Sequence, residues 1–158
     1  MEGARAAGPD DLPTCRALLD TALGDAASMR GGPALLGAWT PDELLGRWSA
    51  DPTRTALFVG EYEHVVVGLG AVTVLEAAPA TPTPPTGRTG RIECCYVEAG
   101  ARGVGVGSEL MATLVRWCAA QGCGNIDALA LPGDRATKQR LETAGFTARL
   151  LVLNRSLG

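Results

Sequence analysis

The stretch Arg102-Gly-Val-Gly-Val-Gly107 (RGVGVG) decides how this chain can fold. It follows an apolar run at residues 92–97 and precedes an amphipathic segment at residues 108–121. A strand that turns through glycines into a helix exposes N–H groups that have no partner inside the helix, and the aligned peptide dipoles make that end partly positive. Glycines also let a ligand approach the backbone without obstruction by Cβ atoms. The stretch therefore predicts a phosphate-binding site, with a plain flexible loop as the alternative.

Two familiar phosphate-binding motifs do not fit this stretch. A P-loop places a lysine and then a Ser or Thr after its glycines, and Gly107-Ser108 lacks that lysine. A Rossmann fingerprint has its third glycine one residue later and opens a long α/β domain, whereas only about fifty residues follow here. Asp127 lies about twenty residues downstream, but it opens the next apolar run instead of closing it. The glycines therefore belong to another class of phosphate site.

The spacing R-x-x-G-x-G that begins at Arg102, after Tyr-Val at residues 96–97 and before an amphipathic segment, resembles motif A of the GNAT superfamily. These proteins are acetyl-CoA-dependent N-acyltransferases. A second stretch, Leu-Glu-Thr-Ala-Gly-Phe at residues 141–146, is similar to the Y-E-K-x-G-F ending of the family's following helix. The distance between the two motifs also suits the family. The resemblance covers roughly residues 56 to 155.

Length and composition indicate one globular domain. The chain has 158 residues, of which 46% are hydrophobic, enough to bury a core and more than a disordered chain would carry. Its formal net charge of −3 provides no general attraction to nucleic acid or anionic membranes. No apolar run approaches the ~20 residues that span a bilayer, and the first residues lack the apolar core of a signal peptide. We expect a single cytoplasmic domain over residues 1–158 without nucleic-acid or membrane partners, and a homodimer is possible.

The cysteines and the single histidine exclude two further classes of site. Five cysteines, an odd number without a C-x-x-C pair, indicate reduced thiols and no disulfide framework. Cys118 falls on the apolar face of a predicted helix and is expected in the core. His64 lies between two predicted strands, and the cysteine spacings do not suit zinc. We therefore expect no metal site and disfavour a Ser-His-Asp hydrolase.

Periodicity, capping residues and turn signals predict the element order ααβββαβαβ. Helices are expected over residues 10–23, 41–50, 105–121 and 134–144. Strands are expected over residues 56–62, 65–75, 91–97 and 125–131, with one or two more over 146–154 and a hairpin turn at Glu63-His64. The proline-rich segment 77–90 is expected to be an extended loop, either a solvated hairpin loop or a lid over the substrate. The order matches the α/β (α+β) fold that the resemblance implies, a mixed central sheet of six to seven strands flanked by about four helices.

The resemblance implies where acetyl-CoA would bind. In the GNAT fold the strand before motif A and the strand after the helix splay apart, and the cofactor lies in that gap. Its pyrophosphate would be received by the backbone N–H groups of Arg102, Gly103, Val104, Gly105, Val106, Gly107 and Ser108. The exposed strand edge at Cys95 and Val97 would pair with the pantetheine arm. Asp134 stands where the family often has asparagine and would contact the cofactor.

The resemblance also implies direct transfer of the acetyl group to an amine. The Cys95 N–H would face the thioester carbonyl and stabilise negative charge there, without a covalent acyl-cysteine. A primary amine with a pKa of ~10.4 is mostly charged at pH 7, so a base is needed. Glu93 occupies a position where family members often have a proton acceptor, and strand alternation places it on the same face as Cys95 and Val97. A cross-strand ion pair or a place in the pocket wall is the alternative role for Glu93.

The chain departs from the family at Leu141, where many members have a tyrosine that reprotonates the CoA thiolate. Leucine has no proton to give. A thiolate with a pKa near ~8.5 can take its proton from solvent, or from another side chain such as Tyr96, the nearest phenol in sequence. Tyr96 alternates away from Glu93 along the strand, which favours solvent.

The sequence thus predicts an N-acetyltransferase that acts on a primary amine of a small molecule or peptide. Two other classes stay open: a non-catalytic acyl-CoA-binding or regulatory module of the same fold, and another CoA- or nucleotide-binding enzyme that shares only the phosphate loop. The amine is not specified. Trp39 and Trp48 could wall an apolar acceptor pocket or pack in the core, and no acidic cluster marks a polyamine or aminoglycoside site.

Overall fold

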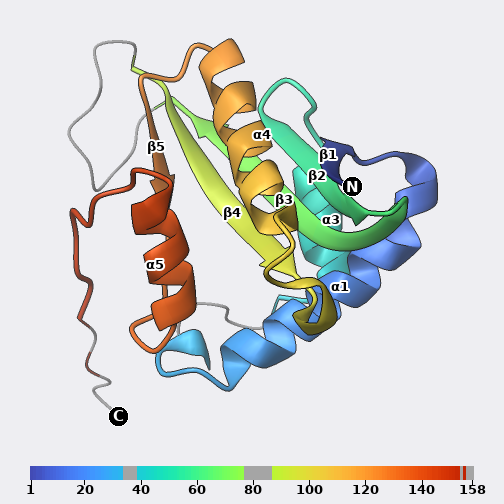
Figure 1. Ribbon diagram of the computed structural model, residues 1–158. Helices are drawn as coiled ribbons and strands as arrows, with labels where there is room; N and C mark the ends of the chain where they lie inside the picture. Colours follow the sequence, from blue (N-terminus) through green and yellow to red (C-terminus); the bar gives the residue numbers. More distant parts are fainter. Residues whose placement is uncertain (34–38, 77–86, 154, 156–158) are drawn as a thin grey trace.

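A computed structural model of the chain describes residues 1–33, 39–76, 87–153 and 155. Its elements are β1 (Glu2–Ala6), a 3-10 turn (Pro9–Asp11), α1 (Leu12–Ala27), α3 (Pro41–Ser49), β2 (Thr55–Tyr62), β3 (Val65–Leu75), β4 (Thr89–Val97), a second 3-10 turn (Ala99–Ala101), α4 (Val106–Ala120), β5 (Asn125–Ala128) and α5 (Arg135–Thr143). The strands form one sheet in the order β1-β2-β3-β4-β5 (Figure 1). β1 to β4 pair antiparallel, and β4 pairs parallel with β5. The predicted mixed sheet flanked by helices is confirmed.

The two ends of the chain differ from the prediction. Within the described residues the sheet has five strands, not six to seven. The strand predicted over residues 146–154 is wrong, because residues 146–153 are in neither a strand nor a helix, and residue 154 lies outside the described residues. The sequence also fails to predict β1, since Glu, Gly and Ala are poor strand formers. Pairing with β2, in register from Glu2↔Tyr62 to Ala6↔Phe58, is what makes it a strand.

Three element boundaries also differ from the prediction. β5 ends at Ala128 and is half-buried, whereas the apolar run predicts a buried strand to residue 131; Leu129 is 58% exposed. β4 begins at Thr89, inside the segment predicted as a loop; residues 77–86 of that segment lie outside the described residues. α1 continues to Ala27, one turn beyond its predicted end. In each case pairing or packing with a distant element sets the boundary.

Helices cover both faces of the sheet. α4 packs across β1 to β4 on one face, and α1 and α3 pack on the other (Figure 1). The core on the α4 face includes Phe58, Val72, Ile92, Val97, Val106, Leu110, Leu114 and Cys118. The core on the α1 face includes Cys15, Leu18, Leu19, Leu45, Trp48, Val59, Leu69 and Ala71. Cys118 is therefore a core residue, as predicted, and Trp48 packs in the core rather than in a pocket wall, while Trp39 is 49% exposed.

Glycines in the sheet let α4 approach it closely. A Cβ added at Gly60 would lie 2.6 Å from Val106 Cγ1, and one at Gly90 would lie 2.4 Å from Cys118 Sγ. A Cβ at Gly68 would lie 2.9 Å from a leucine methyl group of the same helix. Because real Cβ atoms essentially never approach so closely, any side chain at these positions would push the helix away from the sheet. The glycines thus fix the height of α4, and with it the position of the loop that precedes the helix.

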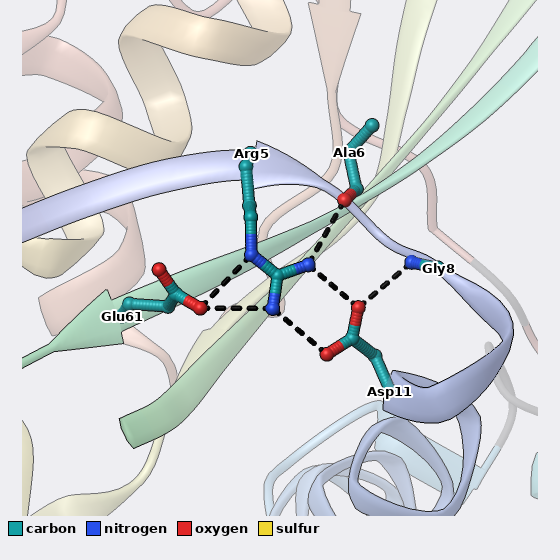
Figure 2. A network of polar contacts seen from close by, with 5 residues as sticks. All are labelled: Arg5, Ala6, Gly8, Asp11 and Glu61. Carbon is teal, nitrogen blue, oxygen red and sulfur yellow. Dashed lines mark hydrogen bonds and ion pairs between the residues drawn. The ribbon is translucent and has the colours of Figure 1, made fainter. Parts of the chain in front are cut away.

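A polar network holds β1 in place (Figure 2). The Arg5 guanidinium donates to both carboxylate oxygens of Asp11, at 2.7 and 2.9 Å, and to Glu61 Oε1 at 2.9 Å. The Gly8 N–H donates to Asp11 at 2.7 Å. The hydrogen bonds from Arg5, followed by that from Gly8, lower the pKa of Asp11 to about 2. The network ties β1 to β2 and to the start of α1, and so fixes a strand that its own residues do not favour.

Local signals in the sequence explain two other boundaries. α3 begins with a capping box, in which Thr40 Oγ1 accepts from the Glu43 N–H at 3.3 Å and Glu43 Oε2 accepts from the Thr40 N–H at 2.9 Å. β2 and β3 are joined at Glu63 and His64, both with positive φ (49° and 68°), the geometry that suits the twist of a two-residue hairpin. The predicted start of this helix and the predicted hairpin turn are confirmed.

Candidate functional site

The loop before α4 presents free backbone donors, as its glycines predict. Gly103 and Gly105 have φ of 87° and 98°, in the left-handed region that favours glycine, and Gly105 is the N-cap of α4. The N–H groups of Ser108 and Glu109 donate to the Gly105 carbonyl. Within the described part of the chain, no acceptor is bonded to the N–H groups of residues 103–107. These donors sit at the positive end of the helix dipole, which suits an anion.

The space around the loop differs from one glycine to the next. A Cβ at Gly103 would meet no atom within 4 Å, and one at Gly107 would meet only Val97 Cγ2 at 3.6 Å and Arg140 Nη1 at 3.8 Å. Gly105 differs, because its Cβ would meet the Glu2 side chain of β1 at 3.2 Å. The loop is therefore open at Gly103, closed by β1 at Gly105, and lined by Val97 and Arg140 at Gly107.

β4 and β5 separate beside this loop. Their pairing ends at Ile92↔Ala128, so residues 93–97 of β4 have β3 on one side and, among the described residues, no strand on the other. The predicted splay of the two strands is confirmed. Cys95 and Val97 thus lie on an unpaired edge, although the Val97 carbonyl accepts from Arg102 Nε at 2.9 Å. The free edge leads from the loop to the middle of the sheet.

β4 has a bulge at Glu93. The prediction that Glu93 faces the same side as Cys95 and Val97 assumes regular strand alternation, which the bulge interrupts. Val72 pairs with Ile92 and Ala71 pairs with Cys94, which leaves Glu93 without a partner in β3. Ile92 and Val97 are an odd number of residues apart, yet both pack on the α4 face. Alternation therefore cannot be counted through Glu93, and bulges of this kind re-aim side chains next to functional sites. Glu93 is half-buried and lies just beyond the last β4–β5 pair.

The cysteines of β4 are poor nucleophiles. Burial raises the pKa of the Cys94 thiol to about 12 and that of the Cys95 thiol to about 11. The positive charge of Arg140 opposes the rise at Cys95 without overcoming it. Because the thiolate is the reactive form, both thiols are inert at neutral pH. This agrees with a role for Cys95 through its backbone alone.

Tyr96 and Arg102 form a cluster with Asp25 of α1. The Tyr96 hydroxyl donates to Asp25 Oδ2 at 3.3 Å, and Arg102 Nη2 lies 3.7 Å from the same oxygen. The Arg102 guanidinium also lies over the Tyr96 ring, 5.6 Å from its centroid. Burial, and then the charge of Asp25, raise the pKa of Tyr96. Tyr96 packs on the α1 face and Cys95 on the α4 face, so alternation correctly places them on opposite sides.

Two predicted positions lie on α5. Asp134 caps this helix, with its carboxylate accepting from the Thr137 N–H at 2.9 Å, so the carboxylate already has a structural role. Leu141 is buried, with 8% of its surface exposed. The sequence reasoning missed two charged residues of the site, Asp25 and Arg140. Their sequence positions carry no signal for this, because only the fold brings α1 and α5 to β4.

In the part of the chain that the structure describes, no helix is both long and apolar enough to cross a membrane. The same residues contain no group of three or more His, Cys, Asp or Glu side chains arranged to hold a metal ion.

Comparison with known families identifies the arrangement. A profile of the acetyltransferase (GNAT) family matches residues 17–146. The match begins well before residue 56 and ends before residue 155, so it includes the larger part of α1 and all of α3, which the two motifs alone did not cover. No curated protein sequence matches the chain.

Solved structures share this fold over nearly the whole chain. The aminoglycoside N-acetyltransferase AAC(6')-Iy, in complex with a bisubstrate analogue of CoA, is 16% identical with a TM-score of 0.75, covering 99% of this chain and 98% of its own. A predicted acetyltransferase from Clostridium acetobutylicum with acetyl-CoA is 19% identical with a TM-score of 0.69 (99% and 97% covered). A transcriptional regulator from Bacillus halodurans is 18% identical, also with a TM-score of 0.69 (99% and 100% covered). At these identities the similarity shows the fold alone.

Proposed function

The chain belongs to the acetyltransferase (GNAT) family, and we propose that it transfers the acetyl group of acetyl-CoA directly to a primary amine of a small molecule or peptide. The observation that carries the proposal is the pairing of two features: free N–H groups at the start of α4, and an unpaired edge of β4 beside them. The first suits a pyrophosphate and the second suits an extended arm with amide groups. Acetyl-CoA has both parts in one molecule.

We assign the pyrophosphate to the free backbone N–H groups of residues 103–107, because those of Arg102 and Ser108 already donate to Ala99 and Gly105, and the pantetheine arm to the β4 edge at Cys95 and Val97. Gly107 of the loop faces this edge, since the nearest neighbour of a Cβ built there is the Val97 side chain. Arg102 holds the end of the strand by its hydrogen bond to the Val97 carbonyl. Asp134 supports the site indirectly by capping α5.

Residues of β4 would carry the transfer. Glu93 accepts the proton of the attacking amine, directly or through a water molecule, and the Cys95 N–H stabilises negative charge on the thioester oxygen. A bond forms between the amine nitrogen and the acyl carbon, and the C–S bond breaks with its electron pair going to sulfur. The raised pKa values of Cys94 and Cys95 support transfer without a covalent enzyme intermediate.

We give Tyr96 no role as proton donor to the sulfur. Its hydroxyl already donates to Asp25 on the α1 side, whereas Cys95 packs on the α4 side. Since the chain's five cysteines are free thiols, we also propose a reducing, cytoplasmic location.

A second function is favoured by one observation. Leu141 is buried where many family members have a tyrosine, and one protein of this fold is named a transcriptional regulator. The chain could therefore bind acetyl-CoA as a regulatory module without turnover. Both functions need the cofactor, so only a rate measurement separates them.

The test combines ligand identification with turnover. Mass spectrometry of the purified protein identifies any bound CoA species, and release of free thiol is then followed with acetyl-CoA and a panel of primary amines. Thiol release that depends on an amine supports the transferase, and Glu93→Gln should then lower the rate mainly at acidic pH. CoA binding without turnover for any amine supports the regulatory module. A protein that binds no CoA species contradicts both.

A further inference from the structure

Arg91 of β4 is a half-buried cation that lacks a counter-ion in the described part of the chain. Its Nε atom is enclosed by the protein and has no hydrogen-bond partner there. None of the ion pairs among the described residues includes Arg91. Because a guanidinium that leaves bulk water needs an anion or other acceptors in its place, Arg91 is suited to meet an anionic group of a ligand.

The register of the sheet places Arg91 on the α1 face. Arg91 is directly opposite Thr73 of β3, and residues directly opposite each other in an antiparallel pair share a face. Thr73 follows Leu69 and Ala71 at intervals of two, and both of these pack in the core on the α1 face. The pairing of Arg91 precedes the bulge at Glu93, so the irregularity of β4 does not affect this placement.

The neighbours of Arg91 in the sheet make this part of the face polar. Thr73 Oγ1 is also buried and has no hydrogen-bond partner among the described residues. On the other side, Asp127 of β5 is in register with Arg91. A hydroxyl and a guanidinium next to each other are both donors, and together they match the oxygens of a carboxylate.

Arg91 lies where β4 and β5 begin to separate. The last pair of the two strands, Ile92↔Ala128, follows it directly, and Glu93, the proposed base, is two residues away. Residues two apart in a strand are separated by about 7 Å, a distance that one small molecule spans. Val97, by contrast, is six residues or about 20 Å along the strand, so a pyrophosphate on the loop that follows Val97 does not reach Arg91.

We propose that Arg91 binds a carboxylate of the acceptor, so that the acceptor is an amino acid. The inference rests on the proposed transferase function and narrows its substrate class. In the complex the guanidinium donates paired hydrogen bonds to the carboxylate, while the amine of the same molecule lies at Glu93. The amine nitrogen bonds to the acyl carbon, its proton goes to Glu93, and the electrons of the C–S bond go to sulfur, which takes a proton from solvent. The carboxylate holds the acceptor in place and forms no covalent bond.

The same cation selects against other amines. Polyamines and aminoglycosides carry only positive charges, which Arg91 repels. In a longer peptide the terminal carboxylate lies many bonds from the first amine, so the two groups cannot reach Arg91 and Glu93 together. A free amino acid has both groups within one small molecule.

The experiment compares acceptors that differ only in the charge of one group. Rates are measured with acetyl-CoA and the common L-amino acids, each beside its α-carboxamide. For the best acceptor, the wild-type kcat/KM should be about ten- to a hundredfold higher for the amino acid than for its carboxamide, the range expected for hydrogen bonds to a charged group. Arg91→Met should abolish this preference, and Arg91→Lys, which keeps the charge, should restore part of it. Arg116→Met, at an exposed arginine of α4, is the control and should keep the wild-type preference.

The outcomes separate this inference from the proposed function. Turnover of amines by the wild type without a preference for the carboxylate overturns the role of Arg91 and leaves the transferase standing, and this comparison needs no variant to fold. An unchanged preference in Arg91→Met also overturns it. Calorimetric titration of the CoA-loaded protein with the N-acetylated form of the best acceptor is a readout without turnover, and Arg91→Met should weaken this binding at least tenfold. Absence of turnover with every amine, with or without a carboxylate, overturns the transferase and this inference together.

Discussion

The two sides of the candidate site are built differently. On the α4 side, Leu110 and Leu114 are completely buried, and glycines of three strands lie directly under the helix. On the α5 side, β5 has four half-buried residues, and a hollow lined by Val115, Ala119, Ile126, Phe146 and others separates the end of α5 from α4. Beyond α5 the side chains of residues 150–153 are between 61% and 85% exposed. The glycine loop proposed to bind the cofactor thus sits on the densely packed side.

The two sides therefore contribute to the candidate site in different ways. Binding of a pyrophosphate by backbone donors needs those donors held in place, and dense packing under α4 supplies that rigidity. The α5 side contributes exposed side chains such as Arg140, whose replacement costs little in packing. The departure from the family's tyrosine at Leu141 falls on the side that tolerates such a change.

The largest effect is expected at the centre of the α4 core. Leu110→Ala removes a fully buried side chain that packs over several glycines of the sheet. The sheet backbone beneath it is rigid and cannot move into the cavity that the substitution leaves. The free energy of unfolding should fall by ~2–5 kcal/mol, as for other leucines in dense cores. Denaturant unfolding monitored by circular dichroism measures this change. A loss below ~1 kcal/mol would mean that the α4 side is not the tightly packed one.

The next effect concerns cofactor binding at the glycine loop. Gly107→Asp adds a carboxylate beside Arg140, where phosphate is proposed to bind, so it both pairs with that cation and repels the phosphate, and the affinity for CoA should fall by about a hundredfold, or ~2.7 kcal/mol. Gly107 is a sharper choice than Gly105, whose positive φ and contact with Glu2 would perturb the loop in any case. Calorimetric titration with CoA provides the measurement. Gly107→Ala is the matched control and should bind within a few-fold of wild type; equal losses in both variants would indicate crowding instead of charge.

A smaller loss of stability should follow from lifting α4 off the sheet. Gly60→Ala places a methyl group 2.6 Å from Val106 Cγ1, an overlap that the helix must relieve by moving. Overpacking of this kind costs ~1–3 kcal/mol. Gly3→Ala, in the adjacent strand β1, meets nothing within 4 Å and should be neutral or slightly stabilising. Thermal unfolding of the pair measures the difference, and similar Tm values would contradict the close approach.

The anchor of β1 should make stability depend on pH. The lowered pKa of Asp11, about 2, means that its ionised form stabilises the fold above its ordinary pKa near ~3.9, and that this contribution is lost as the pH falls toward 2. Asp11→Asn should therefore lower Tm at pH 7, by less than the core substitutions do. The Tm values of wild type and variant should converge between pH 4 and pH 2. A gap that persists at pH 2 would show that the carboxylate charge is not the cause.

The smallest effect is expected beyond α5. The Leu151 side chain is 72% exposed, so Leu151→Ser removes little buried surface and should change the free energy of unfolding by no more than ~0.5 kcal/mol. Denaturant unfolding, side by side with Leu110→Ala, measures the contrast between the two regions. A loss above ~2 kcal/mol would mean that residues 150–153 are buried in solution, and the comparison between the dense and the sparse side would fail.

Features that depend on neighbouring residues could be predicted from the sequence. The glycine loop between β4 and α4, the hairpin at Glu63-His64 and the capped starts of α3 and α5 follow from local φ preferences, caps and periodicity, and all of them are present. The same local pattern carries the family motif, so the loop proposed to bind the cofactor could be located from the sequence.

Features that depend on distant partners required the fold. β1 is a strand because it pairs with β2, and Arg5 holds it there through Asp11 and Glu61. The Glu93 bulge and the end of β5 are set by pairing across the sheet. Arg140 enters the site because α5 places it beside Gly107, 33 positions earlier in the chain. Hydrogen bonds and close contacts between such residues leave no periodic trace in the sequence, because periodicity reports which face of an element is buried and not what it meets.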